Sequence, residues 1–83
     1  VYHYIKSLIK VYNNVDTAIS AIKVDSQTNR ALSTILNDKR QQEKFTELVH
    51  DLAKAFNRPS YVVAAKIGTP AAQEYQALGE ALL

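Results

Sequence analysis

Glu47 and His50 have the spacing at which one helix face presents two metal ligands. Metal sites in helix bundles that hold two ions need two such Glu-x-x-His pairs and two further Glu residues, and this chain has a single pair. His3, the other histidine, has no second ligand at a recognisable spacing. We therefore predict no metal site and no cofactor, and interpret His50 and Asp51 as part of a solvated helix face.

Nucleophilic chemistry has equally little support in the sequence. The serines lie outside any nucleophile-elbow sequence, and neither Gly68 nor Gly79 belongs to a phosphate-binding loop. The chain has no cysteine, which excludes thiol catalysis, disulfides and thiolate metal sites. We predict that the protein is not an enzyme, has no catalytic residues and takes no small-molecule substrate.

Length and charge limit the remaining classes of function. The 83 residues predict one domain, residues 1–83, and the absence of cysteine fits the cytoplasm. Charged residues interrupt every apolar stretch, so we expect no membrane-spanning segment. The net charge is +2, but residues 1–44 carry seven Lys or Arg against four Asp or Glu, whereas residues 45–83 carry three against four. The basic half of the chain is therefore the N-terminal one.

Apolar residues recur at intervals of three and four along the whole chain, which is typical of amphipathic helices. The first stripe consists of Val1, Ile5, Leu8, Tyr12, Val15, Ile19 and Ile22. Because Asn13 and Asn14 fall between stripe positions, we expect one long helix there, with a break at these residues as the alternative. No segment alternates with a period of two, so the sequence predicts an all-α fold.

Capping residues and breakers divide the rest of the chain. Asp25 and Ser26 offer N-cap oxygens, Asp38 with Gln41 has capping-box spacing, and Pro59 ends the central helix. The predicted helices are Val1–Val24, Ser26–Leu36, Asp38–Phe56, Ser60–Ile67 and Pro70–Leu82. We expect an antiparallel four-helix bundle, with Ser60–Ile67 as a short additional helix.

The corner between the third and fourth predicted helices fits a helix-turn-helix. Its apolar residues have the spacing of that motif, and they are Leu52, Ala53, Phe56 and Val63. The second helix would then turn Ser60, Tyr61 and Ala64 toward a DNA groove. The run LAKAFNRPSYV, followed by Pro70 and AAQEY, resembles the DNA-reading part of chromosome and plasmid partition proteins. The corner is one residue shorter than that family's usual turn, and Asn57 stands at its glycine position.

A second resemblance covers most of the chain. A long first helix, a cysteine-free helical chain of this length and a cationic surface resemble the immunity proteins against pediocin-like (class IIa) bacteriocins. The segment ELVHDLAKAF is similar to the leucine-rich third helix of that family, and KIGTPAAQEYQAL is similar to the region of its last helix. The resemblance implies a cytoplasmic four-helix bundle that protects the producer cell. It also implies that the C-terminal helices recognise a membrane receptor complex.

We therefore predict a helical domain that binds a protein partner, with bacteriocin immunity as the specific function. DNA binding through the helix-turn-helix and a generic interaction or oligomerisation module are the alternatives. The predicted partner-binding residues are Lys54, Arg58, Tyr61, Lys66 and Tyr75.

Overall fold

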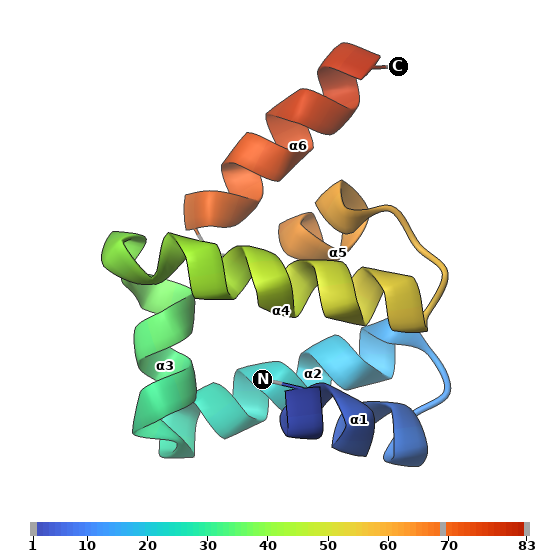
Figure 1. The fold of residues 1–83 in the computed structure, drawn as a ribbon, viewed down its shortest axis with the longest axis vertical. Coiled ribbons are helices and arrows are strands. Elements are labelled where there is room, and N and C mark those ends of the chain that lie inside the picture. Colours follow the sequence, from blue (N-terminus) through green and yellow to red (C-terminus); the bar gives the residue numbers. More distant parts are fainter. Residues whose placement is uncertain (1, 69, 83) are drawn as a thin grey trace.

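The computed structural model describes residues 2–68 and 70–82, and all regular structure in these ranges is helical (Figure 1). The α-helices are α1 (Tyr2–Val11), α2 (Val15–Thr28), α3 (Arg30–Asn37), α4 (Gln42–Ala55), α5 (Ser60–Ile67) and α6 (Pro70–Leu82), and a 3-10 turn, η1, spans Lys39–Gln41. The predicted all-α class is confirmed, and so are the bounds of α5 and α6. Val1, the first residue of the predicted stripe, lies outside the described residues.

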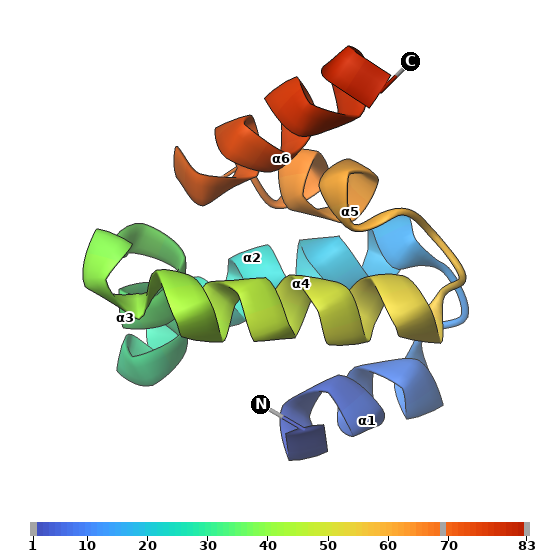
Figure 2. The same cartoon turned by 45° about the horizontal axis from the view of Figure 1, so that its top comes forward.

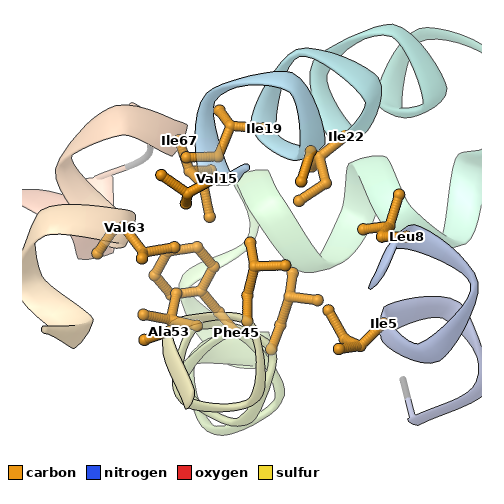
Figure 3. Close-up of a cluster of buried hydrophobic side chains, with 14 of the residues drawn as sticks. Ile5, Leu8, Val15, Ile19, Ile22, Phe45, Ala53, Val63 and Ile67 are labelled. Carbon is orange, nitrogen blue, oxygen red and sulfur yellow. The ribbon is translucent and has the colours of Figure 1, made fainter. Parts of the chain in front are cut away.

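Helix α4 lies at the centre of the molecule and contacts α1, α3 and α5. In Figure 2, α1 lies on one side of α4, and α5 and α6 lie on the other. The apolar face of α4 is almost inaccessible to water and consists of Phe45, Leu48, Val49, Leu52 and Ala53. Figure 3 shows Phe45 and Ala53 among core side chains from α1, α2 and α5. Burial of each large side chain stabilises the fold by about 1.5–3 kcal/mol.

The predicted continuous helix Val1–Val24 is wrong, because the chain leaves helical geometry at residues 12–14 and turns back. Asn14 is the N-cap of α2, and its side-chain oxygen accepts a hydrogen bond from the Thr17 backbone N–H at 2.9 Å. A straight helix over residues 1–24 would be about 36 Å long, whereas α4 extends over only about 21 Å. The turn lets both halves of the stripe reach one core.

The stripe itself is confirmed as core, although two helices carry it. Its buried members are Ile5, Leu8, Val15, Ile19 and Ile22. The spacing of three between Tyr12 and Val15 continues the pattern of four and three across the turn, so the turn leaves no interruption in the apolar spacing.

The next helix begins at Arg30 rather than at Ser26, because α2 continues to Thr28. Asn29 separates the two helices: its N–H donates to the Asp25 carbonyl at 2.7 Å, and its side chain accepts from the Leu32 N–H at 3.2 Å. The capping role predicted for Asp25 is wrong, since its carboxylate accepts a hydrogen bond from the Tyr4 hydroxyl instead.

Asp38 does cap the following segment, as predicted, but the segment begins as a 3-10 turn. The Asp38 carboxylate accepts a hydrogen bond from the Arg40 N–H at 2.9 Å and also pairs with the Arg40 guanidinium. These interactions lower the pKa of Asp38. The α-helix proper starts at Gln42 and ends at Ala55, one residue before the predicted end at Phe56.

The antiparallel four-helix bundle is not confirmed. Helix α3 runs across α4 in Figure 1 rather than along it, and the predicted long first helix is two shorter ones. Only Leu32 and Leu36 of α3 are buried, so this helix closes one end of the core instead of forming a side of a bundle.

The Asn14 cap can be tested by substitution. We expect Asn14→Ala to lower the free energy of unfolding by about 1 kcal/mol, because the Thr17 N–H loses its partner. Asn14→Gly should lower the free energy of unfolding by only about 0.3 kcal/mol, because glycine is also tolerated as an N-cap. Asn13→Ala is the control, and urea unfolding followed by circular dichroism is the measurement. An Asn14→Ala variant as stable as the control would contradict the assigned helix boundary.

Candidate partner-binding surfaces

The corner between α4 and α5 is fixed by its own backbone. Asn57 has a φ of 55°, in the left-handed region. The Arg58 N–H donates to the Ala53 carbonyl at 2.8 Å, and the Asn57 N–H donates to the Lys54 carbonyl at 3.3 Å. These two bonds form a Schellman motif, which satisfies carbonyls that the helix end would otherwise leave without partners. The corner therefore needs no ligand or partner to hold its shape.

Two of the predicted partner-binding cations lie in one hollow, one at the corner and one near the end of α5. Arg58 and Lys66 line one hollow, whose other wall consists of Asn13, Asn14 and the start of α2. The Lys66 ammonium forms an ion pair with the Asp16 carboxylate, which lines the same hollow. Lys54 is exposed on α4 and does not line this hollow. The structure thus brings together two of the three cations, and one of those two already has an acidic partner.

The two predicted aromatic residues lie elsewhere. Tyr61 is half-buried on α5, and Tyr75 is half-buried on α6. Tyr75 meets the ring of His50 edge to face, with ring centroids 6.0 Å apart and an interplanar angle of 80°. Neither tyrosine lines the hollow of Arg58 and Lys66, so the five predicted residues do not form one surface.

Helix α5 has little surface to offer a DNA groove. Its Val63, Ala64 and Ile67 are buried in the core, and α6 packs against another side of the helix. The prediction that Ala64 faces a groove is wrong, because Ala64 is 0% exposed. Among the eight residues of α5, all of them described, only Lys66 is exposed.

His50 joins three helices rather than a metal centre. Its Nδ1 atom lies 2.8 Å from the Ser60 hydroxyl oxygen on α5, and its ring contacts Tyr75 on α6. Within residues 2–68 and 70–82, no group of three or more His, Asp or Glu side chains is placed to hold a metal ion. His50 and Asp51 are exposed, as predicted, and the contact of His50 with Ser60 is an addition that the sequence did not indicate.

A groove runs between α1 and α2, and none of the predicted partner-binding residues lines it. We define the α1–α2 groove by its lining residues, which are Tyr4, Ser7, Leu8, Val11 and Tyr12 from the first helix and turn, and Thr17, Ser20, Ala21, Val24 and Asp25 from the second. Its volume is about 530 Å³. Val11 and Val24 remain 70% and 62% exposed, so the groove presents two large aliphatic side chains to solvent.

One hydrogen bond links the two walls of the α1–α2 groove. The Tyr4 hydroxyl on α1 donates to a carboxylate oxygen of Asp25 on α2 at 2.9 Å. Burial of the Tyr4 ring and this bond raise the pKa of Tyr4 above its ordinary value of 10.0, so the phenol keeps its proton at neutral pH. The bond holds the start of α1 beside the end of α2.

The sequence carried two signals for this groove. Asn14 followed by Asp16 and Thr17 is a helix-start pattern, with an N-cap oxygen and an acidic residue in the first turn. Val11 and Val24 are large apolar residues outside the apolar stripe, where a single amphipathic helix would place polar ones.

Comparison with known proteins gives no relative: no family model, curated protein or solved structure matches the chain. In the described part of the chain, none of the helices has the length and apolar character needed to cross a membrane. Function must therefore be inferred from the surfaces of the molecule itself.

The left-handed residue of the corner gives one prediction. We expect Asn57→Gly to keep or raise stability, because glycine adopts a positive φ without strain, and Asn57→Ala to lower the free energy of unfolding by about 1 kcal/mol. Thermal unfolding measures both. Equal melting temperatures for the Gly and Ala variants would contradict a left-handed Asn57.

The Tyr4–Asp25 hydrogen bond gives a second prediction, on the effect of pH. Tyr4→Phe should lower the free energy of unfolding at pH 7 by about 1 kcal/mol, since a partly buried hydrogen bond is lost. Because the folded pKa of Tyr4 lies above its unfolded value, this residue's contribution is complete below pH 10 and declines as the pH rises further. The wild type should therefore lose more stability than Tyr4→Phe between pH 9 and pH 11. Parallel losses in the two proteins would contradict the bond, and Tyr2→Phe, at an exposed position, is the control.

Proposed function

We propose that this domain binds a protein partner and that the α1–α2 groove is the docking surface. The observation that carries the proposal is the exposure of Val11 and Val24 at one concave surface. Full burial of a large aliphatic side chain is worth about 1.5–3 kcal/mol, and a ligand that covers Val11 and Val24 gains the share that corresponds to their 70% and 62% exposure. Concave apolar surfaces of this kind are typical of peptide and helix recognition.

A second hollow, between α3, α4 and α6, gives less support for docking. Its volume is about 420 Å³, and its apolar lining includes Ile35, Leu36 and Phe45. Leu36 and Phe45 are already buried, so a ligand placed there would remove little additional apolar surface from water. A hydrogen bond of 2.9 Å from Gln42 to Glu74 also ties α6 to α4 beside this hollow.

A protein partner is favoured over DNA because α5, described in full, has no free helix face for a DNA groove. Docking in a DNA groove needs a helix face with free side chains, and Lys66, the exposed residue of α5, is engaged by Asp16. Lys10 and Lys23, which form no ion pair in the described part of the chain, belong to α1 and α2, the helices that form the α1–α2 groove.

Bacteriocin immunity is the specific function that we propose, and it adds a second contact surface, on α6, to the α1–α2 groove. The resemblance to the pediocin-like immunity proteins implies recognition through the C-terminal helices, and α6 projects from the rest of the molecule in Figure 1. Leu78 on α6 is 58% exposed, which supplies a second apolar contact for a receptor complex. The cytoplasmic location predicted from the sequence belongs to the same proposal.

Expression in a strain sensitive to pediocin-like bacteriocins tests the immunity role. The wild-type chain should reduce killing, and Val24→Asp or Leu78→Asp should abolish protection because each places a charge where a partner needs an apolar contact. Lys44→Asp, at an exposed site outside both surfaces, should still protect. All variants must have the cellular level and thermal stability of the wild type. Unchanged killing by every pediocin-like peptide would contradict immunity.

A further inference from the structure

The shape of the α1–α2 groove suits a helix. Helix α1, which forms one wall, has ten residues and is therefore about 15 Å long, the length of nearly three helical turns. Between the exposed valines, the walls carry the short side chains Ser7, Ser20 and Ala21. Small residues of this kind let a second helix approach closely.

The polar groups of the walls are largely satisfied within the chain. The Thr17 hydroxyl donates to the Asn14 carbonyl at 3.0 Å, and the Ser20 hydroxyl donates to the Asp16 carbonyl at 3.0 Å. The Asp25 carboxylate accepts from Tyr4. The hydroxyl-bearing residues Ser7 and Tyr12 line the groove as well, but the larger part of its lining is apolar, so an apolar stripe fits it better than a polar molecule does.

Two lysines lie about one helical turn from wall residues of the groove. Lys10 follows Ser7 by three positions on α1, and Lys23 follows Ser20 by three positions on α2, so each cation lies next to a wall residue on its own helix. Both are exposed, and the ion pairs found in the described part of the chain, Arg40–Asp38 and Lys66–Asp16, do not involve them.

Helix α1 has no acidic residue at all, so its own charges do not neutralise Lys6 and Lys10. Of the two acidic residues of α2, Asp16 is paired with Lys66 and Asp25 is bonded to Tyr4. A ligand in the groove therefore meets cations on both helices, together with the Asp25 carboxylate that lines the groove.

We infer that the α1–α2 groove binds an amphipathic helix of a protein partner whose aliphatic stripe is flanked by acidic side chains. The inference rests on the proposed function and adds the chemistry of the partner. The stripe covers Val11 and Val24, and the flanking carboxylates meet Lys10 and Lys23. Charge complementarity of this kind selects the partner and its orientation more than it adds affinity.

Two synthetic helical peptides of about 14 residues test the inference. They share one Leu and Ala stripe, and the flanking positions are Glu in the first and Lys in the second. Each is titrated into the isotope-labelled domain, and amide shifts are followed by NMR. We expect the Glu peptide to shift residues of the α1–α2 groove and to bind about tenfold more tightly than the Lys peptide at low salt, because favourable rim contacts replace repulsive ones.

Variants of the domain sharpen the test. Lys10→Glu combined with Lys23→Glu should reverse the preference between the two peptides, and Val24→Asp should weaken both at least tenfold. Lys54→Glu, which reverses an exposed cation on α4, should retain the wild-type preference. Added salt should reduce the difference between the peptides, since rim charges are screened.

The possible failures are distinguishable. Equal affinity for both peptides would overturn the acidic partner and leave the proposed docking groove standing. If neither peptide shifted groove residues at millimolar concentration, the proposed function of the groove would fall with the inference. Shifts of the same residues when the domain alone is concentrated would identify a second copy as the occupant, and would overturn the partner inferred here.

Discussion

The fold depends on burying the apolar face of α4 from several directions. An 83-residue chain without disulfides has little stability to spare, and it must use most of its large aliphatic side chains in one core. Phe45 and Leu52, near the two ends of α4, are almost fully buried, which requires helices along the whole length of α4. The chain meets this requirement with α1 and α2 folded back on each other and with α5 placed by the rigid Asn57 corner.

The same requirement creates the α1–α2 groove. Folding back at Asn14 turns the stripes of both helices toward the core, and the other faces of α1 and α2 then border one concave surface. Val11 and Val24 lie on those faces and stay exposed. The Tyr4–Asp25 hydrogen bond keeps the helices in register without filling the space between them. The surface offered to a partner is thus a geometric consequence of the way in which the core is completed.

Much of the fold was predictable from local signals, and the site largely was not. Apolar spacing identified the core residues of α2 and α4, and Gly68, with a φ of 75°, ends α5 as its sequence context indicates. The break at Asn14 was missed because the apolar spacing continues across the turn, so the stripe alone could not separate one helix from two. The groove needs residues from two helices whose pairing depends on that turn. Ala64 was predicted to face a DNA groove because no local sequence signal shows that α5 packs between the core and α6.

The turn at Asn14 and the groove it creates can be tested by one nuclear Overhauser measurement in the unliganded protein. The structure predicts a cross-peak between the ring protons of Tyr4 and the β-protons of Asp25, since the hydroxyl and carboxylate of these residues are 2.9 Å apart. A continuous first helix would separate the two residues by about 30 Å, far beyond the reach of the effect. Absence of the cross-peak, together with sequential helical contacts through Asn13 and Asn14, would contradict both the fold and the groove.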